Sequence, residues 1–409
     1  MTKVLIVSPD VVDATMAGPG IRAWELTCTL RRHASVTLAI PNESRLTADG
    51  VDIRTYDSNG SSLWQLAQLA DVLLVQGFTL YHFPFLKNLD KPIVVDLYDP
   101  FVIENLEVHS FRAMFERHRV HDRDLAVLIE QLNIGDFFIC SNERQRDYWL
   151  GMLAAGGRIN PFNYRRDKSL RKLIDVVPFG LPNHLPQHDE NVLKGVHPGI
   201  SPDDKVIIWG GGIWAWLDPF TLIEAMAQIA AEWPNVKLFF MGKEHPNAEI
   251  SAVMGGGLYA QAIKLSKDLG LFSRTVFFND RWVEYDKRPN YFLEADIGVC
   301  LHQEFIEMRY ASRTRLLDYI WCGLPILCSK GDSLSQMVEE CELGKTVRCG
   351  DVGEVAEALK SMLATRDLKS RLASHFAKEA SKLSWDKAVL PLLDFLASPS
   401  RAADNQAAG

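Results

Sequence analysis

Short apolar runs alternate with amphipathic stretches along this chain, and this alternation constrains the fold more than any other feature of the sequence. The stretch 111–133 has apolar residues three and four positions apart, which predicts a helix. Strands that alternate with helices form parallel sheets. Because the runs are apolar throughout, helices must cover both faces of the sheet, as in a doubly wound α/β fold. In the first part of the chain the predicted strands lie at 3–9, 35–40, 71–77, 92–98 and 136–141.

The segment VVPFGLPNHLP (176–186) interrupts this periodicity with prolines, a glycine and an asparagine, and the rhythm then begins again. We therefore predict two doubly wound α/β domains, residues 1–180 and 184–384, facing a cleft. Residues 385–397 are predicted to form a final apolar helix, and residues 398–409 a disordered tail. In the second domain we expect strands near 205–212, 236–242, 275–280, 295–301 and 324–329, and helices near 218–233, 258–269, 310–322, 332–340 and 352–376.

Composition and charge exclude several classes of protein. At about 150 residues per domain, the 409 residues correspond to two or three domains. The 44 Lys and Arg against 52 Asp and Glu give a net charge of −8, so no overall positive field attracts nucleic acid. We find no leader-like N-terminus and no apolar run of about 18 residues, so we expect a soluble protein, with peripheral membrane binding left open.

The cysteines and the one DxD-like triplet give no sign of a metal site. Seven cysteines are scattered and mostly set in apolar runs, which is typical of a reduced, cytoplasmic protein. A redox pair of Cys322 and Cys328 is the alternative. The sequence has no CxxC motif and no Cys/His cluster with the spacing of a zinc site. The triplet Asp122-Arg123-Asp124 lies within the predicted helix, where solvated charges are expected, and we predict no metal.

Strand-to-helix turns are where an open parallel sheet binds its ligands, and the first turn of this chain is rich in glycine. SPDVVDATMAGPGIRAWEL (8–26) places Gly18 and Gly20 just before an amphipathic helix. Glycines let the backbone approach a ligand, and a helix start offers free N–H groups to an anion. The glycines come too late for a dinucleotide GxGxxG motif, whose third glycine is also missing. A flexible loop with a helix cap is the alternative.

The matching turn of the second domain, WGGGIWAWLDPF (209–220), has three consecutive glycines directly after a strand. Packing alone is a poor explanation for three glycines in a row, so we expect Gly211 and Gly212 to lie against a ligand. Asp followed by Pro is a usual helix entry. Trp214 and Trp216 could stack on a sugar or base, or pack between domains.

The densest polar stretch lies within 302–332, and we predict a helix there from about residue 308 to residue 321. An arginine at a helix N-terminus is suited to binding a diphosphate. Asp318, further along, could accept hydrogen bonds from ribose hydroxyls. The alternative is an exposed helix on which Arg315 and Asp318 are only neighbours. The residues predicted to lie near the helix N-terminus are Ser312, Arg313 and Thr314.

Several motifs follow one another in an order that resembles a known family. In the second half these motifs are VVPFGLP, IIWGGG, LFFMGK, VFFNDRWVEYD, ADIGVCL and RLLDYIWCGLPILCS. This half is similar to the nucleotide-binding domain of retaining glycosyltransferases of family 4 (GT4). That family has the GT-B architecture, two Rossmann-like domains around a deep cleft. The loop AGPGIRAWEL and the segment FFICSNERQRDYWLG resemble its first domain, and the final helix with Trp385 resembles the element that crosses back onto that domain.

Two departures from the family pattern concern charged residues. The second carboxylate of the family's paired-glutamate motif is matched by Asp318, but Tyr310 replaces the first glutamate eight residues earlier. Glu304 or Glu307 could supply that carboxylate instead. In the turn 209–220 the family commonly has an arginine and a lysine on the diphosphate, and this chain has bulky apolar residues. The cations left for the diphosphate are Lys243, Arg281 and Arg313.

The resemblance implies transfer of a sugar, with retention of anomeric configuration, from a nucleotide-diphosphate sugar to a hydroxyl of a glycan, lipid-linked or small-molecule acceptor. A UDP- or GDP-sugar is the expected donor. The resemblance also implies that no metal is needed, because basic groups and the N-terminus of a helix stabilise the charge of the leaving diphosphate. The base would be gripped near Arg281, Trp282 and Val283. Asp99 would contact the transferred sugar or acceptor, with an Asp-Pro turn as the alternative. The predicted catalytic groups are Asp99, Glu307, Arg281 and Arg313.

Two other functions stay open at this point. A sugar-nucleotide 2-epimerase of GT-B fold would release free nucleotide without an acceptor. A degenerate transferase that binds a nucleotide sugar without turnover would explain the missing glutamate. The expected location is the cytoplasm, with peripheral binding to the inner face of the membrane left open.

Overall fold

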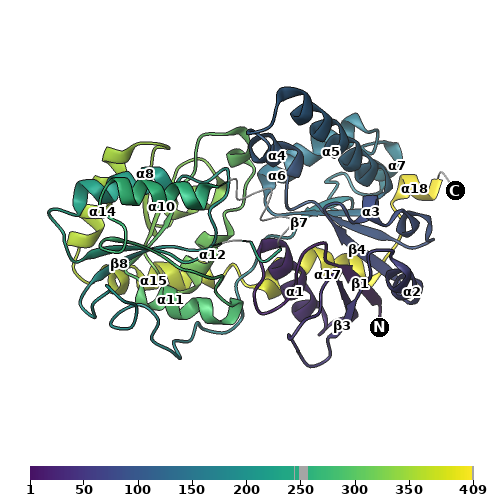
Figure 1. Cartoon of the computed structure of the whole chain (residues 1–409). Helices are drawn as coiled ribbons and strands as arrows, with labels where there is room; N and C mark the ends of the chain where they lie inside the picture. The colour runs from purple at the N-terminus through teal and green to yellow at the C-terminus, as the bar shows by residue number, and fades with distance from the viewer. Residues whose placement is uncertain (244, 248–256, 408–409) are drawn as a thin grey trace. The chain divides into compact units, whose positions relative to one another are not determined.

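The computed structural model describes residues 1–243, 245–247 and 257–407. The chain divides into two compact units: unit 1 comprises Met1–Gly180 and Trp385–Gly409, and unit 2 comprises Leu181–Ser384. Each unit is a parallel sheet with helices on both faces (Figure 1). The predicted α/β class with two doubly wound, Rossmann-like domains is therefore confirmed.

Unit 1 contains a seven-stranded sheet in the order β3-β2-β1-β4-β5-β6-β7. The register pairs Val4 of β1 with Val36 on one side and Val72 on the other. The sequence order of the strands reverses between β1 and β4, so the carboxyl ends of these two strands flank the expected ligand crevice. The strands are β1 (Lys3–Val7), β2 (Ser35–Ile40), β3 (Asp52–Thr55), β4 (Val72–Gln76), β5 (Ile93–Asp96), β6 (Phe137–Cys140) and β7 (Ile174–Val176).

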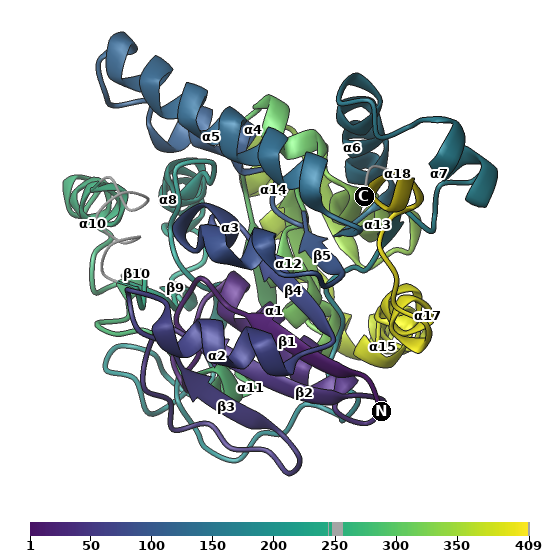
Figure 2. The same ribbon diagram turned by 90° about the vertical axis from the view of Figure 1, so that its right-hand side faces the viewer.

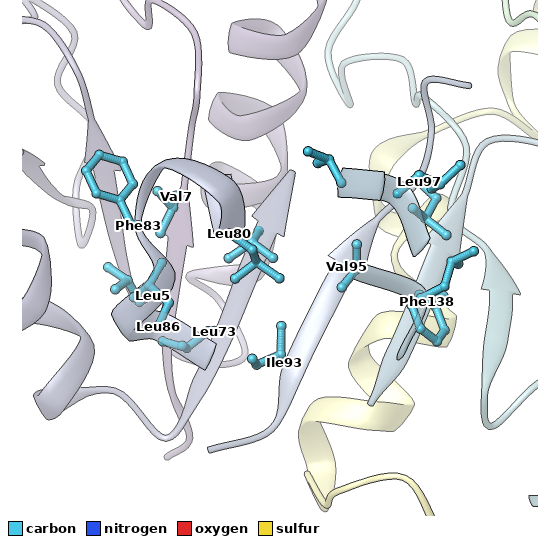
Figure 3. Close-up of a cluster of buried hydrophobic side chains, with 14 of the residues drawn as sticks. Leu5, Val7, Leu73, Leu80, Phe83, Leu86, Ile93, Val95, Leu97 and Phe138 are labelled. Atoms are coloured by element: carbon cyan, nitrogen blue, oxygen red, sulfur yellow. The ribbon is translucent and has the colours of Figure 1, made fainter. Parts of the chain in front are cut away.

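The core of unit 1 explains why the apolar runs predicted its strands. Leu5, Leu73 and Val95 come from adjacent strands and are almost fully buried (Figure 3). Sequence analysis missed β3 and β7. Most of β3 is exposed and carries charged residues, and β7 has only three residues, so neither forms an apolar run.

The helices of unit 1 fill the intervals between strands. The predicted helix 111–133 is observed as α5, which begins three residues later. The helical elements are α1 (Gly18–Leu30), α2 (Ser61–Leu69), α3 (Thr79–His82), η1 (Pro84–Asn88), α4 (Phe101–Val108), α5 (Met114–Ile134), α6 (Glu143–Ala155), α7 (Pro161–Arg166), α16 (Trp385–Ala388), α17 (Leu390–Ala397) and α18 (Ala403–Ala407).

The C-terminal segment differs from its prediction in two ways. The single helix expected over 385–397 is two helices, α16 and α17, and Pro391 lies in the first turn of the second. The disordered tail predicted over 398–409 is wrong, since its described part is ordered against unit 1. There Asp404 pairs with Arg158 at 2.7 Å, and α18 lies beside α7 (Figure 2).

Unit 2 contains a six-stranded sheet in the order β10-β9-β8-β11-β12-β13. Here the order reverses between β8 and β11. The strands are β8 (Lys205–Trp209), β9 (Val236–Phe240), β10 (Val276–Phe278), β11 (Ile297–Cys300), β12 (Ile326–Ser329) and β13 (Gly344–Val347). The helical elements are α8 (Pro219–Ile229), α10 (Leu258–Asp268), η2 (Tyr285–Lys287), α11 (Arg288–Glu294), η3 (Ile306–Arg309), α12 (Thr314–Trp321), α13 (Ser333–Glu340), α14 (Val352–Ala364) and α15 (Leu368–Ala380).

Two helix predictions in unit 2 need correction. The helix expected over 308–321 starts only at Thr314, because a separate 3₁₀ turn, η3, precedes it. The helix expected over 352–376 is two helices, α14 and α15. α14 ends at Ala364, where Thr365 is extended, and Asp367, with φ 55°, directly precedes α15.

All seven cysteines carry free thiols, so Cys322 and Cys328 are not joined. Within the described part of the chain, no helix combines the length and the apolar character needed to cross a membrane.

Candidate functional site

The glycine turn after β8 is held in place by α12. Gly210 N donates a hydrogen bond of 2.8 Å to the Tyr319 hydroxyl, which in turn donates to Val299 O at 2.9 Å. Arg315 Nη2 donates to Gly212 O at 3.1 Å, and its guanidinium lies 5.0 Å from the Trp209 ring centroid. Arg315 therefore has a structural role, and the alternative of a solvent-exposed neighbour of Asp318 does not apply.

The glycines also permit a close approach of two backbone segments. Gly211 has φ +85°, a conformation that favours glycine. A Cβ added at Gly242, just after β9, would lie 2.7 Å from Gly211 C. The turns after β8 and β9 thus touch backbone to backbone. This contact explains part of the glycine requirement, and ligand contact at Gly211 and Gly212 stays a prediction.

Three aromatic rings come together beside this turn. Trp214, His245 and Trp282 follow β8, β9 and β10, and their ring centroids are 5.5 to 6.1 Å apart. Trp214 also lies over Gly212, where an added Cβ would be 2.4 Å from the indole. Trp216, by contrast, is buried within unit 2. We call Trp214, His245 and Trp282 the aromatic cluster; flat rings at this edge of the sheet are suited to stacking on a base or sugar.

Arg313 forms a buried ion pair directly before α12. Its Nη2 lies 2.6 Å from Glu307 Oε2, and the two side chains are only 7% and 5% exposed. Burial tends to lower the pKa of Arg313, but the charges of Glu307 and its neighbours outweigh it and raise that pKa. Arg313 Nε makes no hydrogen bond to any described residue. The predicted catalytic residues Arg313 and Glu307 are thus brought together, and the Nε donor of Arg313 is not used by this pair.

Asp318 is engaged by a residue that sequence analysis missed. Arg288 contacts its carboxylate with both guanidinium ends, Nη1 at 3.1 Å and Nη2 at 3.2 Å. Burial raises the pKa of Asp318, and the nearby charges of Arg288 and Arg315 oppose this. Arg288 begins α11, thirty positions before Asp318, and nothing in the sequence pairs the two.

The remaining predicted residues of unit 2 have less defined surroundings. Arg281 is 80% exposed at its side chain and lies 3.3 Å from Asp280. Val283 is buried, while Lys243 and Trp282 are half-buried. Arg281 therefore points to solvent, and the structure does not bring it to Arg313. Ser312 is half-buried before Arg313, and Thr314 opens α12.

A histidine at the switch point of unit 2 was also missed. His302 follows β11 and is fully buried, with Nε2 3.4 Å from Asp332 Oδ2 and Nδ1 3.8 Å from Cys349 Sγ. Burial lowers the pKa of His302, but the contacts with Asp332 and Cys349 outweigh burial. The pKa of His302 is therefore raised. The only sequence signal was a histidine directly after an apolar strand.

In unit 1, the loop after β1 packs tightly against the start of α1. A Cβ at Gly20 would lie 2.1 Å from Val11 O, whereas the same atom at Gly18 would meet open space. Gly20 is thus required by packing, and of the two Gly18 is the better placed for ligand approach. The next polar residue of α1, Arg22, is fully buried with Asp96, their Nε–Oδ2 distance being 2.5 Å.

Asp99 lies near two other carboxylates. Burial is the largest influence and raises the pKa of Asp99; Asp96 adds to this, and a hydrogen bond with Glu104 opposes it. The contact of Asp99 with the transferred sugar or acceptor stays a prediction, with the Asp-Pro turn as its alternative.

The Asp122-Arg123-Asp124 triplet lies in α5 as predicted, but the expectation of solvated charges is wrong for Asp124, which is fully buried. Asp122 is exposed beside His118, and Asp124 is buried and accepts a hydrogen bond from Asn105. Across residues 1–243, 245–247 and 257–407, no group of three or more His, Cys, Asp or Glu is arranged to hold a metal ion.

Comparison with solved structures defines the fold. Sucrose-phosphate synthase from Thermosynechococcus elongatus superposes with a TM-score of 0.66 at 15% identity, covering 100% of both chains. Anabaena HepE in complex with UDP-glucose gives a TM-score of 0.66 at 15% identity, covering 97% of this chain and 100% of that one. WaaG, a glycosyltransferase involved in lipopolysaccharide biosynthesis, gives 0.65 at 14% identity with the same coverage. The chain therefore has the GT-B fold, as expected.

Comparison of sequences finds one matching family model and one curated relative. Residues 197–382, which make up most of unit 2, match the family described as glycosyl transferases group 1. The chain is also 23% identical over 227 residues to D-inositol 3-phosphate glycosyltransferase of Nocardia farcinica (strain IFM 10152). That match covers 55% of this chain and 47% of the relative, so the chain spans about half the length of the curated relative it matches.

Proposed function

We propose that this protein is a retaining, GT4-type glycosyltransferase that moves a sugar from a nucleotide-diphosphate sugar to an acceptor hydroxyl. One observation carries the proposal: the glycine turn, the aromatic cluster and the Arg313–Glu307 pair all lie at the carboxyl edge of the unit 2 sheet. In doubly wound folds this edge is where nucleotides bind.

The parts of a nucleotide sugar match distinct features of this edge. Its base would stack on the aromatic cluster, its ribose would bind Asp318, and its diphosphate would lie between the glycine turn and Arg313. UDP- and GDP-sugars are the proposed donors, and a solved neighbour of the same fold was crystallised with UDP-glucose. In this proposal Lys243 and Arg281 supply further positive charge.

The chemistry needs stabilisation of a leaving diphosphate. The bond from the anomeric carbon to the diphosphate oxygen breaks, and a bond to the acceptor oxygen forms on the same face of the sugar. The acceptor proton passes to the departing diphosphate. Arg313 and the free N–H groups at the start of α12 would stabilise the charge on that diphosphate without a metal. Glu307 would hold Arg313 in place, and Asp99 would contact the sugar or acceptor.

A second candidate function is nucleotide-sugar binding without turnover. It is favoured by one observation: Tyr310 occupies the position of the family's first glutamate, and the nearby Glu307 is already paired with Arg313. The two functions differ in one product, since only an enzyme releases nucleoside diphosphate.

The experiment is a thermal-shift screen of the full chain with UDP, GDP, dTDP and ADP sugars, followed by a nucleotide-release assay with each sugar that binds. A binder raises the melting temperature by mass action. Release that requires an added acceptor supports transfer, and release of nucleotide with a free sugar and no acceptor supports the 2-epimerase. Binding without release supports the second candidate, and the absence of any shift would contradict both.

For the acceptor side, we propose that unit 1 binds anionic membrane surfaces in the cytoplasm, which suits a lipid-linked or glycan acceptor. Residues 161–172 carry five cationic side chains against one acidic one, in a chain whose net charge is −8. Phe162 and Tyr164 in the same segment are 58% and 50% exposed. Exposed aromatic rings beside clustered cations are suited to an anionic bilayer interface.

A further inference from the structure

A second polar cluster lies at the carboxyl ends of β11, β12 and β13, and the proposed transfer reaction does not use it. It consists of His302 after β11, Ser329 and Asp332 at and after β12, and Cys349 after β13. The His302 backbone N donates to Ser329 Oγ at 3.1 Å, and Asp332 caps α13 through Oδ1. The cluster is therefore fixed by the backbone of three adjacent strands.

The surroundings of the His302 ring suit its protonated form. Nε2 lies 3.4 Å from Asp332 Oδ2, and neither of these two buried atoms has a hydrogen-bond partner among the described residues. Nδ1 lies 3.2 Å from Gln303 O and 3.8 Å from Cys349 Sγ. Both ring nitrogens thus face acceptors, which a neutral imidazole, with a single N–H, could satisfy on one side only. An imidazole N–H that faces a sulfur can stabilise the negative charge that develops on that sulfur as it reacts.

Cys349 differs from the other partly exposed cysteines of the chain. Cys28 and Cys341 are half-buried like Cys349. Burial raises the pKa of Cys28 to about 12, and burial together with Glu379 raises the pKa of Cys341. Neither of these two thiols has a histidine among its described hydrogen-bond partners, whereas Cys349 has His302.

We infer that Cys349 is a reactive thiol, activated by His302 and oriented by Asp332, and that it is a modification site for peroxides and other soft electrophiles. With hydrogen peroxide, the thiolate sulfur attacks one peroxide oxygen, an S–O bond forms and the O–O bond breaks. The sulfur is oxidised to sulfenic acid and the peroxide is reduced. The hydroxide that leaves takes the proton of the imidazolium and becomes water. No nucleotide takes part, so this inference does not depend on the proposed function.

Peptide-resolved alkylation tests the inference on the full chain. Limiting iodoacetamide at pH 7 should alkylate Cys349 at least about tenfold faster than Cys28 and Cys341, since the thiolate is the nucleophile. Dimedone added after brief exposure to hydrogen peroxide should label Cys349 before either of them. Equal rates for Cys349 and Cys341 would overturn the inference.

Two variants separate activation from simple exposure. His302→Gln should slow alkylation of Cys349 about tenfold while the rate at Cys341 stays unchanged. Because His302 is buried and this variant could fail to fold, Asp332→Asn serves as a second variant, whose side-chain oxygen can still cap α13. Asp332→Asn should also slow the alkylation of Cys349. If either variant folds, as judged by circular dichroism, and Cys349 reacts as fast as in the parent, His302 does not activate it.

Discussion

At the residue scale, the polar groups of this chain act in pairs whose members come from different segments. Arg22 with Asp96, Arg288 with Asp318 and His302 with Asp332 are separated by 74, 30 and 30 positions. Of these six residues the sequence predicted only Asp318 as a site residue, because a pairing between distant segments leaves no periodic signal. Arg313 and Glu307 are six positions apart, and both were predicted.

The buried Arg313–Glu307 pair predicts the effect of removing the cation. Arg313→Ala should lower kcat for nucleotide release about a hundredfold, the usual effect of losing one group that stabilises a developing anion, worth about 3 kcal/mol. The single variant also leaves Glu307 buried and unpaired, which costs about 3–5 kcal/mol of stability. The double variant Arg313→Ala/Glu307→Gln should recover most of that stability without recovering kcat.

Arg309→Ala, at an exposed position of η3, is the matched control for both measurements. Steady-state release kinetics and urea unfolding report the two effects separately. A kcat within about twofold of the parent in a folded Arg313→Ala protein would remove Arg313 from the diphosphate site.

Asp318 should affect donor binding rather than the chemical step. Its proposed ribose contacts are the same in the ground state and the transition state, so Asp318→Asn should raise KM for the donor about tenfold and change kcat by less than about twofold. Asp286→Asn, at an exposed position of the same unit, is the control and should change neither. A selective loss of kcat in Asp318→Asn would instead place this carboxylate at the reacting centre.

The buried amine of Lys369 predicts how the stability of unit 2 changes with pH. Burial lowers the pKa of Lys369 from 10.5 to about 8, and its Nζ donates to Leu293 O at 3.0 Å. Between pH 8 and pH 10.5 the unfolded chain holds a proton that the folded chain has lost. Unfolding therefore takes up a proton, and the stability of the fold rises with pH across this window.

Lys369→Met removes this titration. The free energy of unfolding of the parent minus that of the variant should increase by about 2 kcal/mol from pH 7.5 to pH 10, since each unit of pKa shift corresponds to about 1.4 kcal/mol. Lys378→Met, at an exposed position of the same helix, should show no such slope. Urea unfolding of both proteins at both pH values measures this difference. If the difference is the same at both pH values, Lys369 is not the group that titrates.

At the element scale, helices and strands with a buried apolar face were predictable, and those held by polar contacts were not. The strands β1, β4, β8 and β11 are each a run of buried apolar residues, which is why the alternation showed them. The C-terminal α18 is small and polar, and several polar contacts hold it, among them that of Asp404 with Arg158. Arg158 itself sits in no apolar pattern, so a composition rule predicted disorder instead.

The basic segment around α7 should bind anionic vesicles. The full chain should co-sediment with vesicles of phosphatidylserine and phosphatidylcholine but not with phosphatidylcholine alone, and added salt should weaken the binding. Reversing three of its exposed charges, Arg165→Glu/Lys168→Glu/Lys172→Glu, should reduce binding at least about a hundredfold.

The matched control reverses three exposed cations of unit 2, Lys264→Glu/Lys267→Glu/Arg274→Glu, and changes the net charge by the same amount. If both triple variants lose binding equally, net charge rather than this segment is responsible. If the α7 variant binds as tightly as the parent, the segment is not the membrane contact.

At the scale of the whole molecule, the chain passes between its units at two points that lie together on unit 2. Leu181 N donates to Leu383 O at 2.7 Å, so the segments that enter and leave unit 2 are paired. Each unit has its own sheet and its own buried core, and the candidate site residues of each unit follow the carboxyl ends of its strands. The two sheets are therefore expected to unfold as separate cooperative units, with the nucleotide bound by one of them.

Calorimetry of the full chain should accordingly show two unfolding transitions, of which nucleotide shifts one. Core variants identify them: Leu73→Ala should lower the transition of unit 1, and Ile207→Ala that of unit 2, since each leaves a cavity beneath a buried strand. UDP or GDP, whichever binds in the thermal-shift screen, should raise only the transition that Ile207→Ala lowers, by about 2.7 kcal/mol at a hundred times its Kd. Inorganic phosphate at the same concentration is the control and should give a much smaller shift, because it lacks a base for the aromatic cluster. If nucleotide shifts only the transition that Leu73→Ala lowers, the donor site lies on unit 1. Gly211, Arg313 and Asp318 are then not donor-site residues.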